Sequence, residues 1–191
     1  MKSMSENRKK MVVGGFIAFI MIASIFVVTL DYVFSPAQGL TYNNVKFTPG
    51  SNQFFAKING KDYSFLVYPA DLEYIDVPAH AKELLTAQVL TVTYDPQSQV
   101  AESLATAQYY LEEQLQGVRI IDRAVLNNTG LALEQKSCAN ATTSQPVIEL
   151  REGDNSSIRV EGDCISIIAF DSPDLLRMAE RIAYQILGVM Q

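Results

Sequence analysis

The most hydrophobic part of the chain lies close to its N-terminus. Residues 11–30 (MVVGGFIAFIMIASIFVVTL) form a run of twenty residues without a charged side chain. At about 1.5 Å per residue, a helix of this length spans about 30 Å, which is the thickness of the hydrocarbon core of a bilayer. The pattern therefore predicts one transmembrane helix over residues 11–30.

The charges on either side of this run predict its orientation. Residues 1–10 hold four basic side chains and one acidic side chain, whereas no basic residue follows the run until Lys46. Basic residues that flank a transmembrane helix stay on the cytoplasmic side. We therefore expect a single-pass protein of the plasma membrane with a cytoplasmic tail (1–10), a short linker (31–41) and an extracellular domain (42–191).

The hydrophobic run has two other interpretations. It could be the core of a cleaved signal peptide, because Ser35-Pro36-Ala37 offers small residues at a suitable cleavage position. The run is, however, longer than the roughly 7–15 residues typical of a secretory signal. It could also act within the membrane as a small subunit of a complex that packs through Gly14-Gly15, although these residues do not have the G-x-x-x-G spacing.

Residues 44–68 contain two turn signals, Pro49-Gly50-Ser51-Asn52 and Asn59-Gly60, which is typical of an antiparallel meander. The pattern predicts strands over 44–48, 53–58 and 61–68. The last two are joined by Asn59-Gly60, a dipeptide that favours a two-residue hairpin because both turn positions need a positive φ. This turn sets a register in which the facing pairs are Phe54 with Phe65, Ala56 with Tyr63, and Lys57 with Asp62.

After residue 69 the periodicity changes to one that predicts helices and buried strands. The expected order is a short helix over 76–85, a strand over 88–94, a long helix that ends at Gly117, and a strand over 118–126. Asp95-Pro96 is expected to begin the long helix, with the aspartate as N-cap and the proline at the first helical position. A strand, a helix and a strand in this order favour a βαβ unit with parallel strands.

The C-terminal part of the chain predicts three more strands and a final helix. Residues 127–145 are polar and are expected to form a loop. Strands are predicted over 146–151, 157–161 and 164–170, and the helix is expected to begin at Ser172 as its N-cap. One face of this helix is apolar, and the opposite face carries Arg177, Glu180 and Arg181.

These elements place the domain in the α/β to α+β class. We expect one mixed sheet of about six or seven strands with helices packed on one face. The sheet would begin as an antiparallel meander and continue with the βαβ unit. The transmembrane helix would precede this domain.

The charge of the domain argues against nucleic acid as a partner. Residues 1–10 carry a net charge of +3, so the total of −6 leaves −9 for the rest of the chain. Phosphate backbones repel a domain this acidic. The same charge would also keep the domain soluble.

The two cysteines, Cys138 and Cys164, both follow the hydrophobic run. In an oxidising compartment, an isolated pair is most simply one disulfide bond. Closing a loop of this length would stabilise the fold by about 3 kcal/mol in the chain-entropy model. Two cysteines and one histidine are too few for a structural metal site, so no cofactor or metal is expected.

Three asparagines occur in sequons on the side of the chain that we expect outside the cell. They are Asn127, Asn140 and Asn155, each followed by Ser or Thr two positions later without proline between them. Asparagine in this context accepts N-linked glycans and marks exposed loops. All three are candidate glycosylation sites.

No residue pattern typical of a catalytic site occurs in the chain. The G-x-S-x-G, Walker, H-E-x-x-H and G-x-G-x-x-G motifs are absent, and His80, the sole histidine, is expected on the surface. In parallel α/β units, ligands gather at the carboxyl ends of strands, which here means the turn Tyr94-Asp95-Pro96. Two acidic groups lack the spacing of a calcium loop, so we interpret both as solvated turns. They are Asp71, Glu73 and Asp76, and Glu152, Asp154, Glu161 and Asp163.

Short motifs resemble those of uncharacterised archaeal single-span membrane proteins with an extracytoplasmic, disulfide-bearing domain. The motifs are the lysine-flanked hydrophobic run, Ile58-Asn59-Gly60-Lys61, Cys138-Ala139-Asn140-Ala141-Thr142, Gly162-Asp163-Cys164 and Leu187-Gly188-Val189. The resemblance covers most of the chain, and it implies a prokaryotic plasma membrane. It carries over no catalytic or binding residue.

The sequence therefore favours a membrane-anchored extracytoplasmic module that binds or assembles with other envelope proteins and has no enzymatic activity. The observations behind this expectation are the missing catalytic motifs, the short linker and the stretch rich in sequons. The alternatives are an extracytoplasmic hydrolase that uses carboxylates or a metal, and a subunit that acts through its transmembrane helix.

Overall fold

The computed structural model describes residues 14–26, 39–128 and 130–191. The chain divides into two compact units, residues 1–39 and residues 40–191. In the first unit, residues 14–26 are helical. None of the helices in the described ranges has the length and apolar character needed to cross a bilayer. The structure thus lends no support to the predicted span over 11–30, whose two ends lie outside the described residues.

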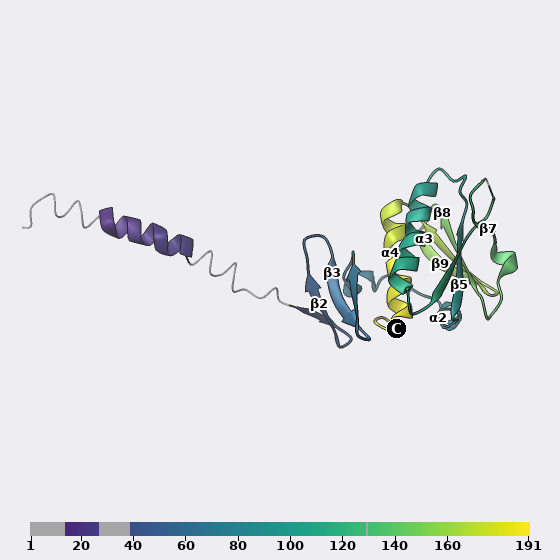
Figure 1. The fold of residues 1–191 in the computed structure, drawn as a ribbon, viewed down its shortest axis with the longest axis horizontal. Helices are drawn as coiled ribbons and strands as arrows, with labels where there is room; N and C mark the ends of the chain where they lie inside the picture. The colour runs from purple at the N-terminus through teal and green to yellow at the C-terminus, as the bar shows by residue number, and fades with distance from the viewer. Residues whose placement is uncertain (1–13, 27–38, 129) are drawn as a thin grey trace, which may run out of the picture. The chain divides into compact units, whose positions relative to one another are not determined.

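The second unit is a mixed α/β fold, and its described residues form ten strands in two sheets (Figure 1). The first sheet is an antiparallel meander in the order β1-β2-β3-β4. Its strands are β1 (Leu40–Tyr42), β2 (Val45–Pro49), β3 (Phe54–Ile58) and β4 (Lys61–Phe65). The prediction of one sheet of about six or seven strands is therefore wrong, because the meander forms a separate sheet.

The meander begins earlier than the sequence pattern indicated. Strand β1 includes the last two residues of the linker predicted over 31–41, and it pairs with β2 through the turn Asn43-Asn44. Both asparagines have positive φ values, 44° and 66°. Asparagine tolerates this backbone region better than most residues, so the dipeptide was a hairpin signal in its own right.

The second sheet has six strands in the order β7-β6-β5-β8-β10-β9. All neighbouring strands are parallel except the antiparallel pair β9 and β10. The parallel pairing of β5 with β6 confirms the predicted βαβ unit. The strands are β5 (Val89–Tyr94), β6 (Ile120–Val125), β7 (Glu134–Gln135), β8 (Val147–Glu152), β9 (Ser157–Glu161) and β10 (Cys164–Ala169).

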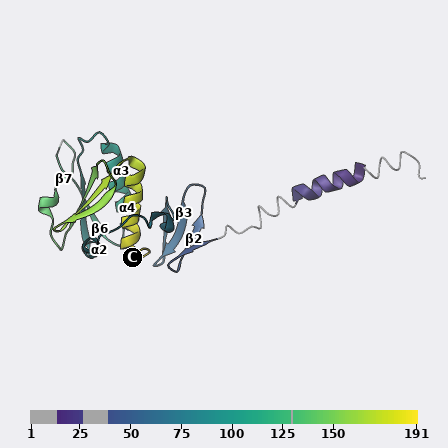
Figure 2. The ribbon, with the colours of Figure 1, turned by 180° about the vertical axis from the view of Figure 1, so that it is seen from behind.

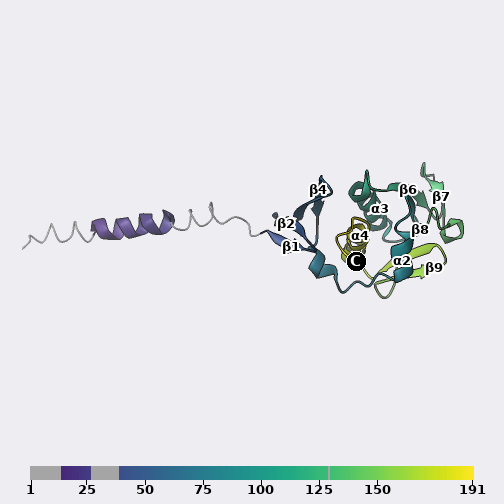
Figure 3. The ribbon, with the colours of Figure 1, turned by 90° about the horizontal axis from the view of Figure 1, so that it is seen from below.

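Two long helices, α3 (Ala101–Leu115) and α4 (Ser172–Ile186), lie between the two sheets. The views in Figures 1 and 3 show the meander on one side of these helices and the six-stranded sheet on the other. Figure 2 shows the same order of layers from behind. The helices therefore bury side chains in both directions, with Leu104 and Leu111 among the fully buried residues of α3.

Three short helical segments complete the unit. A 3₁₀ turn, η1 (Pro69–Leu72), follows the meander, and α2 (Ala79–Leu84) lies within the predicted helix over 76–85 and packs on β9. A second 3₁₀ turn, η2 (Cys138–Asn140), lies in the region where a plain loop was predicted.

The predicted hairpin register is confirmed. Phe54 faces Phe65, Ala56 faces Tyr63 and Lys57 faces Asp62. Phe65, Ala56 and Tyr63 are buried against the helices, whereas Lys57 and Asp62 are exposed and form an ion pair of 3.8 Å. The turn residues Asn59 and Gly60 have φ values of 51° and 85°.

Replacing Asn59 with valine should lower the free energy of unfolding by about 1–2 kcal/mol, because a β-branched residue resists a positive φ. Chemical denaturation would measure the change. Lys57→Val is a matched control, since it places the same side chain at an exposed strand position with extended backbone. Equal stability of Asn59→Val and the wild type would contradict this account of the turn.

The predicted starts of the two long helices need correction. Helix α3 begins at Ala101, and its N-cap Val100 makes no side-chain cap. Asp95 instead closes a tight turn, in which its Oδ1 accepts a hydrogen bond from the Gln97 N–H at 2.9 Å. The N-cap of α4 is Asp171, whose Oδ1 accepts from the Asp174 N–H at 2.8 Å, and Ser172 is the first helical residue.

The polar face predicted for α4 is largely buried. Glu180 is 0% exposed and Arg181 is 4% exposed, because the meander and the segment after it cover this side of the helix. The Leu66 N–H donates to Glu180 Oε1 at 2.6 Å, and the Tyr110 hydroxyl donates to the same oxygen at 3.1 Å. Arg181 Nε donates to the Ile75 carbonyl at 3.3 Å.

Candidate functional site

A polar segment extends the edge of the six-stranded sheet as β7 and then crosses the face of this sheet that points away from α3 and α4. We call residues 130–145, which carry β7 and η2, the strap. The Thr93 hydroxyl, on the central strand β5, donates to the Lys136 carbonyl at 2.8 Å. Thr91 and Thr93 are 1% and 0% exposed, so the strap covers polar side chains of the sheet rather than an apolar core.

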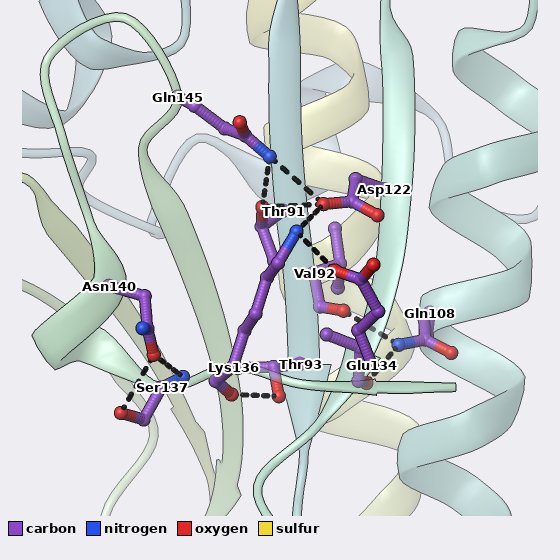
Figure 4. A network of polar contacts seen from close by, with 11 residues as sticks. Thr91, Val92, Thr93, Gln108, Asp122, Glu134, Lys136, Ser137, Asn140 and Gln145 are labelled. Carbon is purple, nitrogen blue, oxygen red and sulfur yellow. Dashed lines mark hydrogen bonds and ion pairs between the residues drawn. The ribbon is translucent and has the colours of Figure 1, made fainter. Parts of the chain in front are cut away.

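Lys136 is the centre of a network that holds the strap to the sheet (Figure 4). Its Nζ lies 2.5 Å from Asp122 Oδ2 and 2.9 Å from Glu134 Oε2. Gln145 Nε2 donates to Asp122 Oδ2 at 2.9 Å and to the Thr91 hydroxyl at 3.0 Å. Hydrogen bonds to Asp122 and to Glu134 raise the pKa of Lys136 above its usual value. This lysine is thus held as a cation and is poorly suited to act as a base.

Gln108 connects the helix layer to the same two strands from the other face of the sheet (Figure 4). Its Nε2 donates to the Val92 carbonyl at 2.7 Å and to the Ala124 carbonyl at 2.9 Å. Gln108 is 3% exposed, so the two hydrogen bonds offset the cost of burying its amide group.

The predicted disulfide between Cys138 and Cys164 is present, with a Cα–Cα distance of 5.2 Å. Cys164 is 1% exposed at the start of β10, and Cys138 lies in η2 of the strap. The bond therefore fastens the strap to the sheet at a second point, beside the Lys136 network.

Glu149 is the carboxylate next to this disulfide. Its Oε2 lies 2.9 Å from Cys138 Sγ, which as a disulfide sulfur has no hydrogen to donate. Arg151 Nε lies 2.6 Å from Glu149 Oε1 and balances the charge. The hydrogen bond to Glu149 raises the pKa of the Arg151 guanidinium.

One group in the described ranges has enough ligand atoms close together to hold a metal ion. Its members are Cys138, Glu149 and Cys164, whose ligand atoms lie within 4.8 Å of one another. Both sulfur atoms are part of the disulfide bond, so only the Glu149 carboxylate remains as a ligand. The residues present therefore do not fit a metal in the disulfide form. The acidic groups around Asp71 and around Glu152 do not form such a cluster within the described residues.

The three sequon asparagines, Asn127, Asn140 and Asn155, are exposed, as expected for glycan acceptors. Asn127 Nδ2 donates to Asp95 Oδ1 at 3.3 Å. Asn140 Oδ1 accepts from the Ser137 N–H at 2.9 Å, where it closes the capping box of η2.

The remaining predicted site residues are spread over the surface. His80 is exposed on α2, where its ring lies 3.2 Å from Glu83 Oε2 and 3.1 Å from the Gly162 carbonyl. The sheet order places the end of β5 at the switch point between β6 and β8, as the βαβ pattern implied. The predicted helix N-terminus is absent there, however, because α3 starts at Ala101.

Sequence reasoning missed a groove of about 310 Å³ on the second unit. Its walls are residues 74–76 after η1, residues 156–158 at the start of β9, and Asp174 and Met178 of α4. Tyr74 is 69% exposed, more than any other large hydrophobic side chain in the described ranges. The signal in the sequence was a tyrosine among acidic residues, in a segment of the chain between two prolines.

Comparison with known proteins adds no relative. No family model matches the sequence, and neither the curated proteins nor the solved structures give a match. The fold and the site define the second unit as a mixed α/β domain whose polar strap is fastened by a disulfide.

Proposed function

We propose that the chain is a single-pass membrane protein whose domain, residues 40–191, lies outside the cell and binds other envelope proteins without catalysing a reaction. One observation carries this proposal. Two pairs of groups that could take part in chemistry hold each other as ion pairs, Lys136 with Asp122 and Glu149 with Arg151. Groups paired in this way stabilise the strap and are not free to react with a substrate. This favours a role in binding for the domain.

The disulfide supports the extracellular location. Structural disulfides persist in oxidising compartments and are rare in the cytosol. The bond between Cys138 and Cys164 joins two buried or half-buried residues of the same domain, as a structural bond does. The exposed sequon asparagines favour the same side of the membrane.

A crosslinker that reacts with amines and does not enter cells tests location and partner together. Lys46 and Lys57 are exposed on the meander, so intact cells should yield a crosslinked complex of defined mass. The control is the variant Lys46→Arg/Lys57→Arg, which keeps the charge but should lower the yield. Reaction only after the cells are permeabilised would contradict the location. Modification without any crosslinked species would contradict the partner.

The alternative is a hydrolase that uses carboxylates or a metal, for which Cys138, Glu149 and Cys164 would supply ligands only with the disulfide reduced. Metal analysis of the protein, purified without reducing agent, distinguishes the two. Stoichiometric zinc would favour the hydrolase, whereas two oxidised cysteines and no metal would favour the binding module.

A further inference from the structure

The groove between η1, β9 and α4 has an aromatic side and a polar side. Tyr74 supplies the aromatic side and exposes more than two thirds of its surface. Ile75, Ile158 and Met178 are buried beside it and make the floor apolar. At about 310 Å³, the volume lies at the lower end of the range of small-molecule sites.

Two carboxylates and the Ser156 hydroxyl form the polar side of this groove. Asp174 Oδ2 accepts from the Ser156 hydroxyl at 2.7 Å, and its Oδ1 accepts from Arg177 at 2.9 Å. Asp76 also lines the groove. The Ser157 hydroxyl is buried and has no hydrogen-bond partner among the described residues. The groove thus offers several acceptors to a ligand, whereas the Ser157 hydroxyl lies below its surface.

The charges around the groove select against a strongly ionic ligand. Each carboxylate has an arginine nearby, because Arg177 is bonded to Asp174 and the charge of Asp76 acts on the buried Arg181. The two carboxylates would repel an anionic ligand. A cationic ligand would have to compete with two arginines for the same carboxylates. A neutral ligand with an apolar face and several hydroxyls avoids both costs.

We propose that this groove binds a neutral saccharide, with one ring face on Tyr74 and hydroxyls on Asp76 and Asp174. The proposal rests on the proposed function, because it names the ligand class of a binding module outside the cell. Aromatic rings contact the apolar faces of ligands, and carboxylates accept hydrogen bonds from hydroxyls. The saccharide could come from a glycan on another molecule or from the chain's own Asn155, which precedes the groove residues 156–158.

The test is binding of the full-length chain to an array of neutral, acidic and amino oligosaccharides. The chain is produced in a host that adds no N-glycans and is kept in a zwitterionic detergent, because a sugar head group would compete. We expect retention on neutral oligosaccharides and a loss of at least about tenfold in affinity for Tyr74→Ala. Tyr109→Ala is the matched control, since Tyr109 is 54% exposed on α3, and it should bind like the wild type.

Further arms separate the outcomes. Tyr74→Phe should retain most of the affinity, because the ring face remains, and Asp76→Asn should weaken binding. Both the wild type and Asn155→Gln are also produced in a glycosylating host. If only Asn155→Gln then binds the array, the chain's own glycan at Asn155 is the occupant of the groove. Absence of binding to any neutral saccharide, equal binding by Tyr74→Ala, or retention on amino sugars alone would overturn the proposal. None of these results depends on the crosslinking outcome, so the two proposals fail separately.

Discussion

Replacing Glu180 with glutamine should abolish a loss of stability that the wild-type domain shows as the pH rises. Burial raises the pKa of Glu180 to about 7 from an ordinary value of 4.5, and hydrogen bonds from Val67, Leu66 and Tyr110 oppose this shift only in part. Between these two pH values the folded state holds one proton more than the unfolded state. Stability is therefore fully present below about pH 4.5 and falls as the pH rises through about 7.

The expected size of this loss is about 3 kcal/mol, since each pKa unit corresponds to about 1.4 kcal/mol. Urea denaturation of the wild type and of Glu180→Gln at a series of pH values would measure it as a difference between the two proteins. Other carboxylates titrate alike in both proteins, so the difference isolates Glu180. Glu113→Gln, on the exposed face of α3, is the matched control and should follow the wild type.

A second variant tests the cause of the shift. Tyr110 donates to Glu180 Oε1 and thereby lowers the pKa of this carboxyl group. Tyr110→Phe removes the donor and should move the loss of stability to higher pH. A wild type and a Glu180→Gln variant with parallel pH profiles would show that Glu180 titrates normally, against this account of its burial.

The largest effect of a covalent change is expected for the disulfide. Replacing both Cys138 and Cys164 with alanine should lower the free energy of unfolding by about 3 kcal/mol, because the bond closes a loop across a sequence separation of 26. For a domain of this size, the melting temperature should fall by roughly 10 °C. Calorimetry with and without reducing agent would measure it.

The strap should remain on the sheet in this variant, because the Lys136–Asp122 pair and the bond from Thr93 hold it independently. Hydrogen exchange of the strap amides would show this. Ser144→Ala, an exposed change on the strap, is the control. If reducing agent leaves the wild type as stable as before while the thiols titrate as free, the bond contributes nothing to stability.

Local patterns predicted those features that depend on neighbouring residues. The register around Asn59-Gly60 followed from two positive φ values, and the βαβ unit followed from periodicity alone. The disulfide followed from having just two cysteines in the chain. In each case few alternative structures are compatible with the sequence. The turn is defined by neighbouring residues, and each cysteine has just one possible partner within the chain.

Long-range packing decided the rest. The meander formed its own sheet because the helices are apolar in two directions, and this same layer buried Glu180, which periodicity had placed on a polar face. Tyr74, Ser157 and Asp174 are far apart in sequence and share a groove only because η1, β9 and α4 meet. The amino-acid sequence by itself therefore determined the Asn59-Gly60 turn, the strand pairing around it and the covalent bond. The tertiary structure decided which polar residues are buried and which surface residues form a site, because both depend on contacts between segments distant along the chain.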